Sequence, residues 1–237
     1  MLLRRTGLLR LAALIALLLA APVLSGCSGG SSGQSASDLL AKAKKTLDST
    51  KTLHFVLDST GAPAGGTALT GGEGDMQRPS SFQGTLKVQV SGSTVDLKVV
   101  SIAGKVYAQL PFTSSYSVID PASFGFGDPG ALLDPKTGIS QLLTAVRSPE
   151  LGAQKRVGGD VVREVTGDLP GDLVQKLLTS KDASKPVHAT FSIATGSGEP
   201  RRVELTGPFF TADKDGTYIL QLSKFGADVH ITAPTGG

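Results

Sequence analysis

Residues Thr85 to Val100 read TLKVQVSGSTVDLKVV, two runs of alternating apolar and polar side chains separated by Ser91-Gly92-Ser93. A period of two places every second side chain on the same face of a strand. A short Gly- and Ser-containing turn between two such runs is typical of a β-hairpin. The stretch therefore predicts two antiparallel strands that share one apolar face, formed by Leu86, Val88, Val90, Val95, Leu97 and Val99.

Further alternating runs lie on both sides of this hairpin. Before it, Leu53, Phe55 and Leu57 alternate with polar residues, and after it a turn at 103–105 leads into a strand over 106–110. A second hairpin is expected around Gly158-Gly159. Closing strands are expected at 187–194, 202–205, 218–222 and 228–231, so short antiparallel strands should make up most of the chain.

Apolar residues at helical spacing indicate a small number of helices. An amphipathic helix is expected to begin after Ser37, as its N-cap, and to end near Ser49. Asp120-Pro121 and Asp134-Pro135 each place a capping residue before a proline, which is typical of a helix start. After Pro170-Gly171-Asp172, a short helix is expected that carries Leu173, Val174, Leu177 and Leu178. The central stripe of apolar residues consists of Leu132, Leu133, Ile139, Leu142, Leu143 and Val146.

These elements predict an α+β fold, with one strongly curved antiparallel sheet and three or four helices against one of its faces. Each alternating strand has a polar side and an apolar side. If the helices cover the apolar side, they enclose an apolar space. Periodicity does not decide whether side chains fill that space, and filled interiors are the rule in proteins.

The amino terminus resembles a bacterial lipoprotein signal. Arg4, Arg5 and Arg10 flank an apolar run that ends in Leu24-Ser-Gly-Cys27, and the run is too short for a permanent membrane span. We therefore expect residues 1–26 to be a signal peptide and Cys27 to be the acylated first residue of the mature protein. Residues 27–36 then form a flexible Ser- and Gly-rich tether, and 37–237 the exported domain.

The alternative for Cys27 is an ordinary leader or a buried core cysteine. Its position between an apolar leader and a Ser/Gly tether favours lipidation. Cys27 is the only cysteine in the chain. Once it is acylated, the mature protein has no thiol for disulfides, catalysis or metal binding.

The net charge does not favour a nucleic-acid partner. The chain has 23 basic and 20 acidic residues, but three of the arginines and none of the acids lie in the leader. The mature chain is therefore neutral, whereas nucleic-acid binding requires a persistent basic surface.

The residues that usually carry catalysis or metal binding are sparse and scattered. His54, His188 and His230 lie far apart in predicted strands and form no ligand pair. No nucleophile elbow, phosphate-binding loop or dinucleotide motif occurs in a strand-to-helix context. We therefore expect no metal, no cofactor and no enzymatic activity.

Four segments resemble the LppX, LprA, LprF and LprG lipoproteins of mycobacteria. They are the Cys27 signal, GKVYAQL at 104–110, LLDPKTGISQLL at 132–143 and LSKFGADVHIT at 222–232. The segments at 132–143 and 222–232 are most similar to LprG. The extra Phe124-Gly125-Phe126-Gly127 departs from the family pattern at a place where it would alter a cavity mouth. The resemblance implies a half-barrel of antiparallel strands whose helices lie on the concave face and enclose a large hydrophobic cavity.

The resemblance also implies a function. Family members carry multi-acylated envelope lipids: triacylated glycolipids such as phosphatidylinositol mannosides and lipoarabinomannan, triacylglycerol, or long-chain diesters. The expected partners are such a lipid, the plasma membrane through the Cys27 anchor, and a major-facilitator efflux pump. The expected location is the outer face of the cell membrane, with the cell wall or the medium as other destinations. The expected cavity wall consists of Leu86, Val88, Val90, Val95, Leu97, Val99, Leu132, Leu133, Ile139, Leu142 and Val146.

Two other functions remain open at this level. One is a structural or adhesive envelope lipoprotein with a solid core and no ligand. The other is a hydrolase or transferase that acts on envelope lipids. An open cavity would favour a carrier over the first, and a cluster of catalytic side chains would favour the second.

Overall fold

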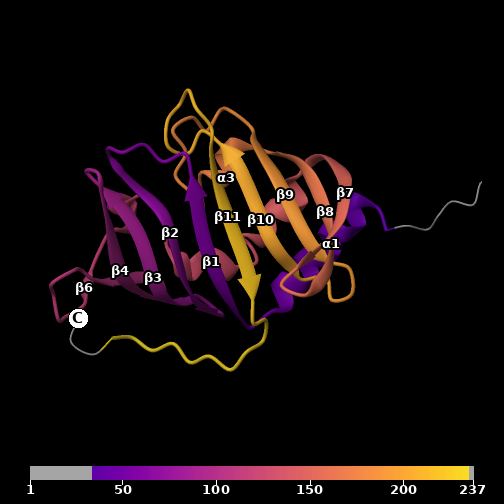
Figure 1. Ribbon diagram of the computed structural model, residues 1–237. Helices are drawn as coiled ribbons and strands as arrows, with labels where there is room; N and C mark the ends of the chain where they lie inside the picture. Colours follow the sequence, from indigo (N-terminus) through magenta and orange to yellow (C-terminus); the bar gives the residue numbers. More distant parts are fainter. Residues whose placement is uncertain (1–33, 235–237) are drawn as a thin grey trace, which may run out of the picture. The chain divides into compact units, whose positions relative to one another are not determined.

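The computed structural model describes residues 34–234, and its main feature is an antiparallel sheet of eleven strands in the order β6-β5-β4-β3-β2-β1-β11-β10-β9-β8-β7. The sheet is open and curved, with the helices on one of its faces (Figure 1). This confirms the expected α+β half-barrel. The strands are β1 Thr52–Thr60, β2 Thr67–Gln77, β3 Ser81–Val90, β4 Ser93–Ile102, β5 Lys105–Gln109, β6 Ser117–Val118, β7 Arg147–Val157, β8 Asp160–Leu169, β9 Val187–Ala194, β10 Pro200–Gly207 and β11 Gly216–Ser223.

The helical segments are short apart from the first. α1 spans Ala36–Ser49, α2 Ser140–Ala145 and α3 Gly171–Val174, and two 3-10 segments, η1 and η2, span Pro121–Phe124 and Pro129–Leu133. The strands and the buried core of the described residues all belong to one compact unit that begins at Gln34. That unit therefore has the properties of an independently folding domain.

The sheet consists of two meanders joined by one long-range pairing. β1 to β6 pair in sequence order, as do β7 to β11, and β1 then pairs with β11 over seven residue pairs from His54–Ser223 to Thr60–Thr217. This pairing places β6 and β7 at opposite edges of the sheet. The connection from β6 to β7, which contains η1, η2 and α2, therefore has to run from one edge to the other.

The hairpin expected at 85–100 is present. Leu86 pairs with Leu97 and Val88 with Val95, and the turn residues Ser91 and Gly92 have φ of 48° and 89°. Positive φ at both turn positions is what a two-residue hairpin requires, and Gly92 adopts it without steric cost. The polar partners Lys87 and Lys98 are exposed, so the alternation correctly predicted which face is buried.

α1 begins two residues before the expected position. The Ser35 hydroxyl accepts a hydrogen bond from the Asp38 backbone N–H at 3.1 Å, and the Asp38 carboxylate accepts one from the Ser35 N–H at 3.2 Å. This reciprocal pair is a capping box. The N-cap is therefore Ser35, and Ser37 lies inside the first turn.

Two expected elements are absent from the described residues. The helix start assigned to Asp134-Pro135 is a turn, in which the Asp134 carboxylate accepts the Lys136 and Thr137 N–H groups, and α2 begins only at Ser140. No strand forms at 228–231. Both edges of β1 are already paired with β2 and β11, so this segment has no strand edge beside it, and the Ile231 N–H donates to the Gln77 side chain instead.

Candidate functional site

A cavity of about 430 Å³ lies between the central strands of the sheet and the helical layer. Its size is within the range of about 300–1,000 Å³ that is typical of small-molecule sites. The wall is formed mainly by apolar side chains. Those from the sheet are Phe55, Leu57, Leu69, Leu86, Phe191, Val203, Leu205, Tyr218 and Leu220; those from the helical layer include Phe126, Leu132, Ile139, Leu142, Leu143, Val174, Leu177 and Leu178; and α1 adds Leu47.

The sheet wall follows from strand alternation. Phe55 and Leu57 share one parity on β1, and Tyr218 and Leu220 share one on β11, which pairs with it. Leu220 is only partly buried although it lies in the middle of an eleven-stranded sheet. It remains partly accessible because it faces the cavity rather than another side chain.

The opposite wall follows from the connection between β6 and β7. This segment crosses from one sheet edge to the other, while the sheet curves away from it. Leu132 and Ile139 lie on the crossing segment and line the cavity with Leu142 of α2. The curved sheet and the crossing segment thus enclose the space between them.

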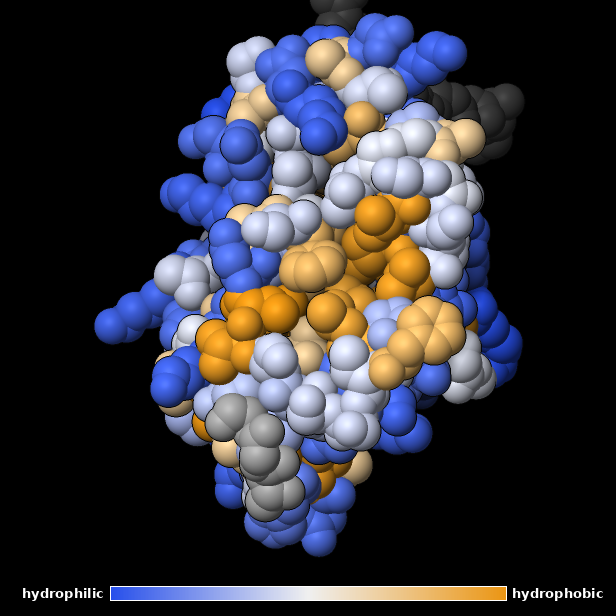
Figure 2. Space-filling model, turned by 90° about the vertical axis from the view of Figure 1, so that its left-hand side faces the viewer, coloured by the Kyte–Doolittle hydropathy of each residue, from blue (hydrophilic) through white to orange (hydrophobic). Residues whose placement is uncertain are grey.

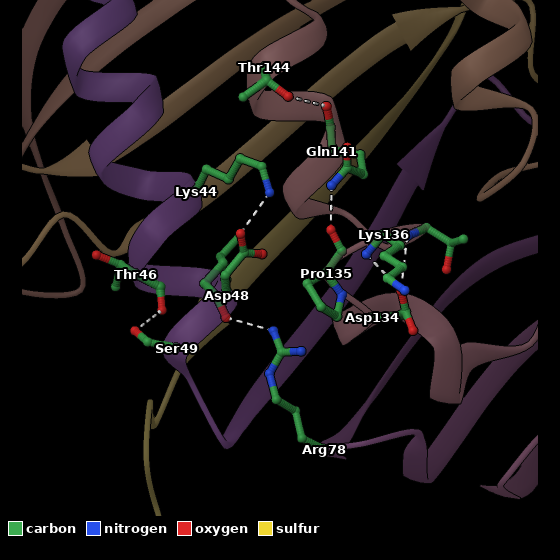
Figure 3. Close-up of polar contacts among 12 residues, drawn as sticks. Lys44, Thr46, Asp48, Ser49, Arg78, Asp134, Pro135, Lys136, Gln141 and Thr144 are labelled. Atoms are coloured by element: carbon green, nitrogen blue, oxygen red, sulfur yellow. Dashed lines mark hydrogen bonds and ion pairs between the residues drawn. The ribbon is translucent and has the colours of Figure 1, made fainter.

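Polar contacts stabilise the carboxyl end of α1, which packs against α2 (Figure 3). Lys44 donates to the Asp48 carboxylate at 2.6 Å, and Arg78 donates to the Leu47 carbonyl at 2.9 Å at the carboxyl end of α1. Burial acts to raise the pKa of Asp48, but the Lys44 ammonium and the neighbouring Ser140 hydroxyl outweigh it and hold the pKa below its usual value. Ser140 begins α2, so the Asp48 carboxyl lies where α1 packs against a helix that lines the cavity.

The polar residues in the wall lie at its rim or are already bonded. Gly127, Thr137 and Lys176 are exposed, so they mark the side on which the cavity opens. Asp128 accepts hydrogen bonds from the Ser101 hydroxyl and the Gly130 N–H. The Tyr218 hydroxyl donates to the Leu69 carbonyl at 2.7 Å, and burial raises its pKa. The cavity is therefore suited to holding apolar groups.

Eleven side chains were expected in the cavity wall, and only some of them line the cavity in the structure. Leu86, Leu132, Ile139 and Leu142 line the cavity. Val88, Leu97, Val99 and Leu133 do not: η2 packs on β3 and β4, and these side chains are buried in solid core. Val95 is a half-buried residue beside that core.

Val90 and Val146 also lie outside the wall. Val90 ends β3 at the hairpin turn and is 38% exposed, because no element covers this end of the strand pair. Val146 follows α2, and its side chain occupies the space beside Gly167 of β8. Both residues have the right sequence parity or spacing, but Val90 is the last residue of β3 and Val146 lies one residue beyond α2, so neither side chain is directed into the cavity.

Sequence reasoning missed the wall residues on β1, β2, β9, β10 and β11. Their signal was present, since Phe55, Leu57, Tyr218 and Leu220 alternate as regularly as the residues of the hairpin. What alternation does not indicate is that β1 pairs with β11, which brings these strands to the centre of the concave face.

The described residues contain no cluster of three or more side chains that could bind a metal ion. His54 pairs with Asp75 at 2.7 Å and His188 with Asp168 at 3.1 Å, and neither pair lines the cavity. No helix among residues 34–234 is long and apolar enough to cross a bilayer. The signal peptide predicted for residues 1–26 and the predicted acylation site Cys27 lie outside the described residues.

The sheet edge beside β4 and β6 carries apolar surface as well. Figure 2 shows this side of the molecule, where apolar side chains gather near the middle and polar ones surround them. Leu110, Phe112 and Val118 are large apolar residues exposed on the segment that leads to β6 and in β6 itself. They are separate from the cavity wall.

The comparison with models of protein families shows to which family this chain belongs. The LppX_LprAFG lipoprotein model matches residues 35–231. The chain belongs to the LppX_LprAFG family. This confirms the resemblance that the sequence motifs indicated.

Individual relatives in the LppX_LprAFG family cover nearly the whole chain. The lipoarabinomannan carrier protein LprG of Mycobacterium tuberculosis H37Rv is 28% identical over 232 residues, 95% of each chain. Lipoprotein LprA of the same strain is 26% identical over 246 residues, 94% of this chain and 96% of its own.

Two solved structures from the family share the fold. LprF of Mycobacterium bovis superimposes with a TM-score of 0.69 at 20% identity and covers 85% of this chain and 97% of its own. LppX of M. tuberculosis gives a TM-score of 0.63 at 18% identity, with coverage of 83% and 98%. The open curved sheet is therefore the fold of this family.

Proposed function

We propose that this protein binds acyl chains of envelope lipids in the cavity and carries the lipids from the cell membrane through the periplasm. The observation that supports this most directly is the apolar cavity of about 430 Å³ beneath the helical layer. The name of the relative LprG, a lipoarabinomannan carrier, points to the same class of ligand.

The energetics favour such a carrier. Each methylene group removed from water gains about 0.8 kcal/mol, so an acylated lipid leaves a membrane slowly unless another apolar environment receives it. If a methylene group occupies about the volume of one water molecule, ~30 Å³, the cavity of about 430 Å³ holds ~14 of them. That corresponds to about one acyl chain. A lipid with two or three chains therefore requires the helical layer to move away from the sheet.

The proposal includes the location and the partners. Acylation of Cys27 anchors the protein on the outer face of the cell membrane, and the tether lets the domain reach lipid there. The cargo is an acylated glycolipid or triacylglycerol, and a major-facilitator efflux pump delivers it to or receives it from the protein. No catalytic step is involved, so the lipid leaves chemically unchanged.

A vesicle assay tests the carrier function. The domain Gln34–Gly237 is mixed with donor vesicles that contain a labelled triacylated lipid and with unlabelled acceptor vesicles. We expect the domain to accelerate transfer in proportion to its concentration, with only intact lipid in the acceptors. Deacylated or transacylated product would instead support an enzyme, and no transfer together with no bound lipid would support a structural lipoprotein.

A further inference from the structure

A second hollow of about 220 Å³ adjoins the cavity of about 430 Å³ described above, which we call the acyl-chain cavity. Leu69 of β2 and Tyr218 of β11 line both hollows, so the two share a wall on the sheet side. The Tyr218 ring in this wall is packed edge-on against Phe209 at 4.9 Å between ring centroids. The shared wall is therefore a fixed part of the core.

On the other side, two chain segments separate the hollows. Phe126 and Leu178 form a β-bridge, and the Thr179 hydroxyl donates to the Gly125 carbonyl at 3.1 Å. We call Gly125–Phe126 together with Leu178–Thr179 the strap. Phe126 and Leu178 line the acyl-chain cavity, whereas Gly125 and Thr179 line the second hollow. Each half of the strap thus contributes to both hollows.

The second hollow has a different chemistry from the cavity. Its wall contains the hydroxyls of Thr67, Ser123 and Thr179 and the ammonium of Lys181. Lys181 is the only charged side chain among the described residues that line it. Among residues 34–234, the side chains of Thr67, Ser123 and Lys181 make no hydrogen bond or ion pair with another residue. They are therefore free to bind a ligand.

We propose that the second hollow binds the polar, phosphate-bearing head of the lipid whose acyl chain occupies the cavity. This inference rests on the proposed carrier function. A phosphate oxygen accepts a charge-assisted hydrogen bond from the Lys181 ammonium, and the free hydroxyls of Thr67 and Ser123 donate to the remaining oxygens. An amphiphilic ligand needs an apolar and a polar site side by side, and these lie on the two sides of the strap. Because the strap separates the two hollows, one lipid occupies both only when the strap opens.

Two single-chain lipids that differ only in the phosphate test the inference. Palmitoyl lysophosphatidic acid and monopalmitoylglycerol are titrated separately into delipidated Gln34–Gly237 below their micelle concentrations, with calorimetric detection. We expect the phosphate-bearing lipid to bind about tenfold more tightly, the size of one charge-assisted hydrogen bond. Lys181→Glu should abolish this preference and leave the affinity for monopalmitoylglycerol unchanged.

Lys105→Glu is the matched control, because Lys105 is also an exposed lysine but lies at the start of β5 and lines neither hollow. It should keep the tenfold preference. Equal binding of both lipids by the wild-type domain would overturn the headgroup site and leave the carrier function intact, whereas binding of neither lipid would overturn both. Inorganic phosphate that binds as tightly as the phosphate-bearing lipid would show a site for the free anion and would also overturn the proposal.

Discussion

At the scale of single residues, Leu220 and Leu97 distinguish open space from solid core. Both are leucines on the apolar face of the sheet, but Leu220 faces the cavity and Leu97 is 1% exposed in packed core. Leu220→Trp should project its ring into the cavity and sharply reduce bound lipid, with a free energy of unfolding within about 1 kcal/mol of wild type. Leu97→Trp should instead overpack the core and cost about 1–3 kcal/mol.

Urea denaturation and lipid extraction of the two variants provide the measurement. If Leu220→Trp is destabilised as strongly as Leu97→Trp, then the space beside Leu220 is filled in solution. Such a result would favour the structural lipoprotein with a solid core over the carrier.

Asp48 gives a prediction that depends on pH. Its pKa is lower in the folded state than its ordinary value, so its contribution to stability is present above pH ~4 and is lost as the pH falls through the folded-state pKa. Asp48→Asn should lower the free energy of unfolding by about 0.5–1 kcal/mol at pH 7, the range for a partly exposed ion pair. The difference between variant and wild type should shrink steadily below pH 4 in chemical denaturation.

Asp38, Asp134 and Asp182 also have lowered pKa values, but they titrate in both proteins and cancel in the comparison. A difference that stays constant down to pH 3 would mean that the Asp48 charge does not stabilise the folded domain.

Residue burial could be predicted from the sequence more reliably than residue function. The parity of Leu86, Val88, Leu97 and Val99 correctly indicated that they are buried, yet only Leu86 reaches the cavity. The other three are covered by η2, whose position depends on contacts between residues far apart in the sequence. Local periodicity contains no information about such contacts.

At the scale of elements, the strap is the segment pair whose opening would let a lipid enter. Phe126 and Leu178 are paired across an antiparallel bridge, where Cα atoms are about 4.5–5.5 Å apart, a separation that suits a disulfide. The domain Gln34–Gly237 contains no other cysteine. Phe126→Cys combined with Leu178→Cys should therefore form one defined crosslink under oxidising conditions.

We expect the oxidised double variant to transfer lipid between vesicles at least several-fold more slowly than the same variant after reduction. The reduced form is the matched control, because it has the same truncated side chains without the crosslink. Equal transfer rates in both redox states would show that lipid enters by a route that does not require the strap to open.

The helical layer is where prediction from sequence was least complete. Asp120 was correctly placed as a cap before Pro121, whereas Asp134 caps a turn and Asp128 caps η2. An Asp-Pro pair fits a helix start and a tight turn equally well, because both use the carboxylate to accept backbone N–H groups. The sequence alone does not choose between them.

At the scale of the whole molecule, the cavity results from the topology of the sheet. Pairing of β1 with β11 joins two meanders and sends β6 and β7 to opposite edges, so the connection between them spans the concave face. Curvature of the strands then leaves space beneath that connection. The strands and their buried faces could be predicted from alternation, but this closing pairing could not, since the residues of β1 and β11 lie more than 150 positions apart.

The central claim is that this cavity contains lipid, and the mass of the intact protein tests it most directly. The domain Gln34–Gly237, fused to a cleavable secretion signal, is exported from a mycobacterial host and analysed by mass spectrometry under non-denaturing conditions. It should show an additional mass equal to that of an acylated lipid. This mass should disappear on denaturation and be absent from Leu220→Trp. A wild-type domain that shows only the mass of the polypeptide, with no lipid in its organic extract, would contradict the account.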